Sequence, residues 1–205
     1  MAALRQRRLQ MATIVTGGSR GIGRNTVENL LKRGVHVILP YHNRNTDAEA
    51  VVSAVKDAGA KAIALQLDAG DIASFDAFVE KVKDALSRLG AARFEFLINN
   101  AGNSHRNMPF ETTTEEELDR IYHVHFKGVF FLTQKLLPLM NDWGRIINLS
   151  TARTRISSAG GSANASMKVT QDYSQCGCAG RTPAPASKSS NCSIVRGPMA
   201  DVIAG

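Results

Sequence analysis

The first 175 residues contain no cysteine, and all three cysteines of the chain lie near its C-terminal end. An odd number of cysteines and a cysteine-free main body are typical of proteins in a reducing compartment, so we expect a cytoplasmic protein. Cys176 and Cys178 have the spacing of half a metal site, but no histidine or second cysteine pair follows at ligand spacing. We therefore predict no metal.

Long hydrophobic runs are also missing. No stretch approaches the roughly 18 consecutive apolar residues of a membrane-spanning helix, so we predict no membrane association. Residues 1–11 are basic, but no apolar stretch follows them, which argues against a secretory signal. We expect these residues to form a disordered basic extension.

Aromatic residues make up only 6% of the chain, and no basic stripe with interleaved aromatics occurs. The net charge of +7 could indicate nucleic-acid binding, but the basic residues are spread along the whole chain. A solvated basic surface combined with an anionic cofactor is the better interpretation. We therefore predict no nucleic-acid partner.

Over residues 12–168, short apolar runs alternate with amphipathic segments. The runs that predict buried strands are residues 12–16, 35–39, 62–67, 94–99 and 145–149. Helical spacing of apolar residues follows the first run, from Ile22 through Val27 to Leu31, and recurs over residues 47–58 and 75–89. Thr114 and Glu117 have the spacing of a capping box, which predicts one long helix through Leu136. The alternation predicts an α/β fold, a doubly wound parallel sheet with helices on both faces.

Residues 169–205 have a different composition, rich in Ser, Pro, Gly, Ala and Cys and without helical periodicity. We expect loop or disorder there. Two explanations stay open: a reading-frame slip after Lys168, or a natural disordered tail.

A glycine-rich motif stands between the first predicted strand and the first predicted helix. It reads Thr-Gly-Gly-Ser-Arg-Gly-Ile-Gly over residues 16–23. Glycines at this place permit a tight turn and a close backbone approach to a pyrophosphate, and the following helix offers free N–H groups to phosphates. The motif predicts a dinucleotide site that includes Thr16, Gly17, Ser19, Arg20, Gly21, Ile22 and Gly23.

Together with three later motifs, this segment resembles the short-chain dehydrogenase/reductase family, whose fold is of the Rossmann type. The later motifs are Leu67-Asp68, then Asn-Asn-Ala-Gly over residues 99–102, and Gly-Arg-Ile-Ile-Asn-Leu-Ser over residues 144–150. The resemblance covers residues 12–168. It implies that Asp68 lies beside the adenine and that Asn100, Ala101 and Gly102 support the nicotinamide side. It also implies that the final helix and strand of the family are incomplete here.

The charge around the second predicted strand indicates which nicotinamide cofactor is bound. NAD(H)-preferring members of the family usually place an acidic residue after this strand, but residues 40–44 contain none. Arg20 and Arg44 are suited to a 2′-phosphate, which attracts positive charge. We predict NADP(H), with NAD(H) as the alternative.

The resemblance also implies a catalytic set, and here the sequence departs from the family. The family uses a Ser, a Tyr and a Lys four residues after the Tyr, supported by an Asn on the preceding helix. Lys168 matches the Lys, Thr151 or the adjacent Ser150 matches the Ser, and His125 stands at the Asn position. The Tyr position is Asn164, and a carboxamide has no proton to give up near neutral pH.

Two functions follow from these residues. The first is an NADP(H)-dependent oxidoreductase that transfers hydride between nicotinamide and a small carbonyl or alcohol substrate, with impaired activity. The second is a catalytically inactive cofactor-binding remnant or frameshifted product. The resemblance leaves a homo-oligomer open if the C-terminal helix forms, and it does not identify the substrate.

Overall fold

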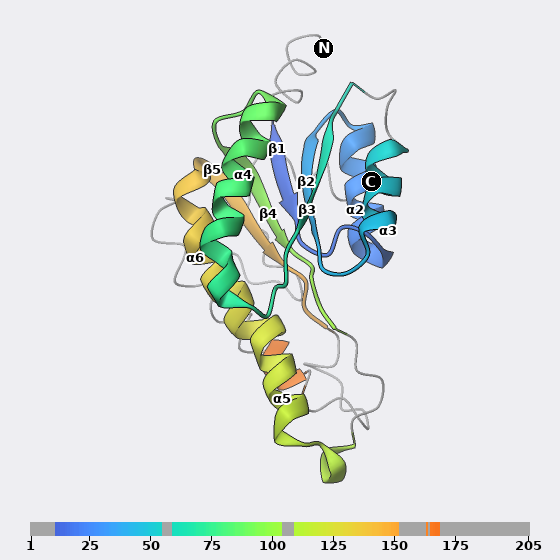
Figure 1. Ribbon diagram of the computed structural model, residues 1–205, viewed down its shortest axis with the longest axis vertical. Helices are drawn as coiled ribbons and strands as arrows, with labels where there is room; N and C mark the ends of the chain where they lie inside the picture. Colours follow the sequence, from blue (N-terminus) through green and yellow to red (C-terminus); the bar gives the residue numbers. More distant parts are fainter. Residues whose placement is uncertain (1–10, 55–58, 104–108, 152–162, 164, 169–205) are drawn as a thin grey trace.

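The computed structural model describes residues 11–54, 59–103, 109–151, 163 and 165–168, which are coloured in Figure 1. The predictions for the N-terminal extension before residue 11, for Asn164 and for the tail from residue 169 lie outside the described residues.

A five-stranded sheet forms the centre of the fold, and every strand pairing is parallel. The strands lie in the order β3-β2-β1-β4-β5. They are β1 (Ala12–Val15), β2 (His36–Tyr41), β3 (Ala62–Gln66), β4 (Phe94–Asn99) and β5 (Met140–Asn148). The predicted doubly wound parallel sheet is confirmed.

Helices cover both faces of this sheet (Figure 1). One face carries α2 (Gly21–Lys32) and α3 (Asn45–Ser53), and the other carries α4 (Phe75–Leu89) and α6 (Gly128–Leu136). Side chains alternate along a strand, so Ile14 packs into the core beneath α4 and α6 while Val15 packs beneath α2. This burial on both faces explains why the strands are continuous apolar runs in the sequence.

The predicted long helix is interrupted, which corrects the expectation of one uniform element. It consists of α5 (Glu115–Tyr122), a π-helical turn η3 (His123–Lys127) and α6. At the junction a Cβ on Gly128 would lie 1.9 Å from the backbone oxygen of Ala69, so the helix approaches the loop after β3 too closely for any side chain. The predicted capping box is present, with the Thr114 hydroxyl accepting from Glu117 N–H.

Several boundaries also differ from the sequence prediction. β2 extends two residues further, because it pairs with β3 as far as Tyr41 after its pairing with β1 has ended. β5 begins at Met140, five residues early, with an irregular register against β4. Ile22 is 68% exposed, so its expected place in the buried stripe of α2 is wrong. It lies in the first turn and lines a cavity.

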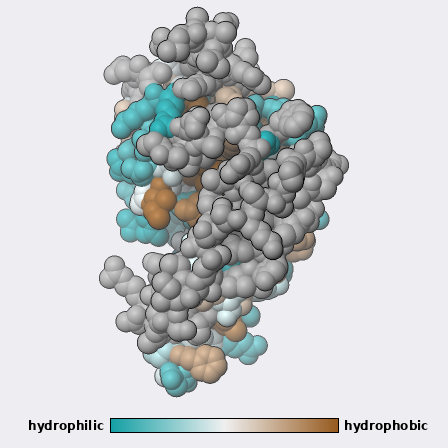
Figure 2. Space-filling view, turned by 180° about the vertical axis from the view of Figure 1, so that it is seen from behind, coloured by the Kyte–Doolittle hydropathy of each residue, from teal (hydrophilic) through white to brown (hydrophobic). Residues whose placement is uncertain are grey.

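Short 3₁₀ turns complete the described elements: η1 (Ile72–Ser74), η2 (Phe110–Thr112) and η4 (Leu137–Leu139). Within the described ranges, none of the helices has the length and hydropathy needed to cross a bilayer. The coloured surface in Figure 2 is largely hydrophilic, with small hydrophobic areas between the polar ones. This matches the exposed polar positions of α2, such as Arg24 and Asn25.

Candidate cofactor site

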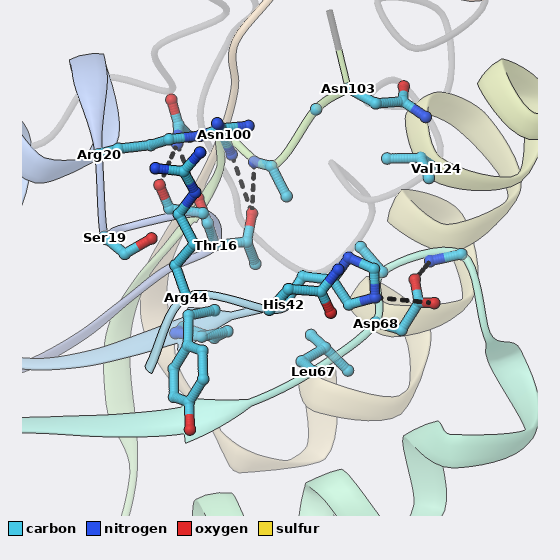
Figure 3. A pocket seen from close by; sticks show the side chains of 18 of the residues that line it. Thr16, Ser19, Arg20, His42, Arg44, Leu67, Asp68, Asn100, Asn103 and Val124 are labelled. Atoms are coloured by element: carbon cyan, nitrogen blue, oxygen red, sulfur yellow. Dashed lines mark hydrogen bonds and ion pairs between the residues drawn. The ribbon is translucent and has the colours of Figure 1, made fainter. Parts of the chain in front are cut away.

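A cavity of about 1220 Å³ opens at the carboxyl edge of the sheet. The glycine loop, the loops after β2, β3 and β4, and the α5–η3 segment line it (Figure 3). It lies where the strand order reverses between β1 and β4, the place where open α/β sheets bind ligands. Typical small-molecule pockets measure roughly 300–1,000 Å³, so this cavity accommodates an extended ligand.

The hydroxyl of Thr16 connects the glycine loop to the segment after β4. Its oxygen accepts hydrogen bonds from the backbone N–H groups of Asn100 at 3.0 Å and Ala101 at 2.9 Å, and it donates to Ile98 O at 3.3 Å. In return, the side-chain amide of Asn100 donates to the backbone oxygens of Thr16 and Gly17. The two predicted motifs are therefore one hydrogen-bonded unit.

Glycine is required at two positions of the loop for different reasons. A Cβ on Gly23 would lie 2.3 Å from Gly17 O and 2.4 Å from the Asn100 amide nitrogen, so no side chain fits. Gly21 has a φ of +54° and open space where a Cβ would stand. The backbone there is free to approach a ligand closely.

Helix α2 begins at this loop and directs its first turn toward the cavity. Among the described residues no side chain caps this turn, and the turn contains no acidic residue. Unsatisfied N–H groups and the positive end of the helix dipole favour an anion here. These features fit the pyrophosphate of a dinucleotide.

Cationic side chains lie at the next part of the cavity. Arg20 and Arg44 both line it, and no acidic residue stands between Pro40 and Arg44. Arg44 is 3.4 Å from Asp47 in an exposed ion pair. Asp68 lies on the loop after β3, where it accepts from Gly70 N–H at 2.8 Å.

Buried amides support the β4 end of the site. The Asn99 amide donates to Asn148 Oδ1 at 2.7 Å and to the Thr133 hydroxyl at 3.2 Å, joining β4, β5 and α6. Ser19 is also buried, and it lines the cavity together with Ala101 and Gly102.

Three of the residues predicted for catalysis, Ser150, Thr151 and Lys168, lie near the end of β5. Ser150 and Thr151 stand two and three residues after the end of this strand and are half-buried. Lys168 is buried, and its Nζ donates to Leu149 O at 2.8 Å, which brings the ammonium group to the same strand end. Asn164 lies outside the described residues, so its relation to Lys168 stays a prediction.

His125 occupies a place that packing explains well. It is buried, with Nε2 2.7 Å from the Asn103 side-chain oxygen and 3.1 Å from the Asn103 backbone oxygen. Because a backbone oxygen only accepts, Nε2 carries the proton. The ring also lies against Gly102, where a Cβ would be 2.8 Å from Cε1. Its place in the catalytic set stays a prediction.

Sequence reasoning missed several residues that line the cavity: His42, Asn103, Arg120 and His123. His42 directly follows the second strand and could have been found from that position. The other three lie on the loop after β4, on α5 and on the π-helical turn, and no sequence period indicates that these segments reach the cavity. The described residues contain no group of three or more His, Cys, Asp or Glu side chains able to hold a metal.

The sequence comparison identifies the family. Residues 11–171 match the family described as short chain dehydrogenase. The chain belongs to the short-chain dehydrogenase family. The match ends at residue 171, so the unusual residues 172–205 lie outside it.

Curated members of the short-chain dehydrogenase family resemble the chain over most of its own length. An uncharacterized oxidoreductase of Methylorubrum extorquens is 35% identical over 143 residues, 70% of this chain and 55% of that protein. The 3-oxoacyl-[acyl-carrier-protein] reductase FabG of Staphylococcus epidermidis is 34% identical over 145 residues, 70% of this chain and 57% of FabG. The chain thus spans little more than half the length of the curated relatives it matches.

Solved structures of this family show the same fold. A short-chain dehydrogenase from Burkholderia cenocepacia in complex with NADP is 30% identical, with a TM-score of 0.76 over 84% of this chain and 69% of that one. The angucycline C-6 ketoreductase LanV with bound NADP is 32% identical, with a TM-score of 0.78 over 84% of this chain and 67% of LanV.

Proposed function

We propose that this chain binds NADP(H) and acts as an oxidoreductase on small carbonyl or alcohol compounds. The observation that carries the proposal is the lining of the cavity at the carboxyl edge, which we call the cradle. There the glycine loop is held to the segment after β4 through Thr16, and Arg20 and Arg44 both line the cavity. No acidic residue follows β2 as far as Arg44. The NADP bound to the two solved relatives supports the same choice.

Each part of the cradle has a proposed role. The first turn of α2 and Gly21 would hold the pyrophosphate, and Arg20 and Arg44 would pair with the 2′-phosphate. Asp68 would accept a hydrogen bond from the adenine amino group. Asn100, Ala101 and Gly102 would lie beneath the nicotinamide side.

The bound cofactor would supply hydride chemistry at the nicotinamide C4. The proposed role of Thr151, or of neighbouring Ser150, is to donate a hydrogen bond to the substrate oxygen and polarise the carbonyl. Lys168 would hold the nicotinamide ribose through its ammonium group. His125 would keep the segment after β4 in place through Asn103.

A cofactor titration tests the proposal. The protein should bind NADPH about tenfold more tightly than NADH, because a charge-assisted contact to the 2′-phosphate is worth about one factor of ten. Fluorescence titration of the two reduced cofactors measures this ratio. Arg20→Ala should erode the preference, whereas Arg24→Ala, one turn along α2, should leave it. Equal affinities in the unaltered protein contradict the proposal.

A second function, cofactor binding without efficient catalysis, is favoured by Asn164. A missing general acid costs about 10²- to 10⁴-fold in rate, because proton transfer then falls to water. Steady-state turnover on a panel of small ketones, at saturating NADPH, separates the two functions. Rates typical of the family would establish the oxidoreductase, and binding with rates near background would establish the remnant. Asn164→Tyr alone should restore little.

A further inference from the structure

His42 and Asp68 contact each other on the wall of the cavity (Figure 3). His42 is the first residue after β2 and Asp68 stands two residues after β3, so the two loops come from adjacent strands. The imidazole Nε2 lies 3.3 Å from Asp68 Oδ2. The other carboxylate oxygen, Oδ1, accepts from Gly70 N–H at 2.8 Å.

This pair lies in the part of the cavity that the proposed function assigns to adenosine. Both side chains are accessible to a ligand, with 58% of His42 and 47% of Asp68 exposed. The other charged groups on the cavity wall are Arg20 from the glycine loop, Arg44 from the same loop as His42, Asp71 beyond Asp68, and Arg120 from α5. A ligand that engages Asp68 therefore competes with His42 for the same carboxylate.

We propose that His42 and Asp68 form an exchangeable pair that sets the preference for a 2′-phosphate, an inference that rests on the proposed NADP(H) function. When adenosine binds, Asp68 turns its carboxylate to the adenine amino group and His42 loses its acceptor. A 2′-phosphate offers the imidazole N–H a new acceptor. A ribose hydroxyl offers a much weaker one. Both cofactors break the contact between His42 and Asp68 when they bind. Only the cofactor with a 2′-phosphate gives His42 a strong new acceptor, so the pair disfavours the cofactor without the phosphate.

The size of the effect follows from the exposure of the pair. Exposed polar pairs contribute modestly, so breaking this one weakens an unphosphorylated ligand by about two- to fivefold. Hydrogen bonds to a phosphate are charge-assisted and stronger, so the new contact of His42 strengthens a phosphorylated ligand by about five- to tenfold. Removing the imidazole should thus move the two affinities in opposite directions.

Two adenosine fragments test the exchange without involving the nicotinamide side. Adenosine 2′,5′-bisphosphate and adenosine 5′-monophosphate differ only in the 2′-phosphate, and calorimetry measures each dissociation constant. His42→Ala should tighten the monophosphate about two- to fivefold, because the pair no longer has to break. It should weaken the bisphosphate by about twofold, because the loss of the phosphate contact exceeds that gain. His42→Gln, which places an amide N–H near the position of Nε2, should return both constants toward the original values.

A matched control is Lys83→Gln, which removes the cation of an exposed ion pair with Glu80 on α4, away from the cavity lining. It should change neither constant. If His42→Ala weakens both fragments, or leaves the monophosphate unchanged, the exchange is wrong while the cofactor function stands. If the unaltered chain binds neither fragment, or binds both equally, the NADP(H) proposal itself fails.

Discussion

The amino ends and the carboxyl ends of the parallel strands, here called the amino edge and the carboxyl edge, differ in what covers them. At the amino edge, Glu95 on β4 accepts from Ala12 N–H at 2.7 Å and from the Asn141 amide at 2.6 Å, so side chains of the protein close the edge. At the carboxyl edge, the first turn of α2 opens to a cavity. The difference indicates that the amino edge serves stability and the carboxyl edge serves ligand binding.

Hydrogen bonds hold the carboxyl edge together on the side that faces the sheet. The side chains of Thr16 and Asn100 bond to each other's backbone groups, and the Asn99 amide donates to Asn148 on β5. The N–H groups in the first turn of α2 therefore face the cavity from a loop whose other side is held by the hydrogen bonds of Thr16 and Asn100. The comparison can be tested by altering each edge in turn.

The largest effect should come from Gly23→Ala on the carboxyl edge. Its Cβ would meet Gly17 O at 2.3 Å and the Asn100 amide at 2.4 Å, so the loop must move. Overpacking against backbone costs about 3 kcal/mol of unfolding free energy, and cofactor binding should be lost. Gly21→Ala is the control, since its site is open and its positive φ costs only about 1–2 kcal/mol. Urea unfolding followed by circular dichroism compares them, and equal losses contradict the assignment.

Thr16→Val should have the next largest effect. It keeps the shape of the side chain but leaves the N–H groups of Asn100 and Ala101 without their acceptor. Orphaning part-buried donors costs about 2–3 kcal/mol in total, and NADPH affinity should fall with it. Thr16→Ser retains the hydroxyl and should lose less than half as much. If the two variants unfold at the same urea concentration, the hydroxyl does not join the two segments.

Much of the carboxyl edge could be predicted from the sequence. The glycine motif and the residues 99–102 each fall at the end of an apolar run, and parallel strands bring such ends together. The amino edge could not be predicted, because Glu95 in β4 and Asn141 in β5 stand 46 residues apart and follow no period. The interruption of the long helix at η3 was also missed. It lies next to the close approach of Gly128 to Ala69, a tertiary contact that helical spacing does not reveal.

The residues predicted for catalysis show the same limit. Lys168 was predicted from its motif, and the structure shows that its ammonium group donates to Leu149 O, next to Ser150. His125 was assigned from alignment with the family pattern, yet its contacts with Gly102 and Asn103 come only from the fold. A sequence motif gives the residue types of a site, whereas packing decides what each side chain touches.

A smaller effect is expected from Asp47→Asn near the carboxyl edge. Asp47 lies 3.4 Å from Arg44, in an exposed pair that partly neutralises this guanidinium. Removing the acid should tighten NADPH about two- to threefold and leave NADH unchanged, since an exposed pair is worth little. Asp84→Asn, which removes the partner of Arg88 on α4, is the matched control. Fluorescence titration at two salt concentrations measures the change, and a parallel gain for NADH would assign the effect to something other than the 2′-phosphate.

The smallest effect, and the one that tests the amino edge, is the pH dependence caused by Glu95. Burial raises the pKa of this carboxyl above its ordinary 4.5, opposed by the hydrogen bonds from Ala12 and Asn141. The folded protein therefore holds this proton more tightly than the unfolded chain. The stabilisation is fully present below about pH 4.5 and is lost as the pH rises through the folded pKa. Glu95→Gln removes this titration, so the stability of the variant relative to the original protein should increase as the pH rises from 4 to 7. At this half-buried position, solvent screening limits the change to less than about 1 kcal/mol.

Urea unfolding from pH 4 to pH 7 measures this change in relative stability, with the exposed Glu80→Gln on α4 as control. A relative stability that decreases with rising pH would mean that the two hydrogen bonds outweigh burial, and that the amino edge holds Glu95 as a charged acceptor.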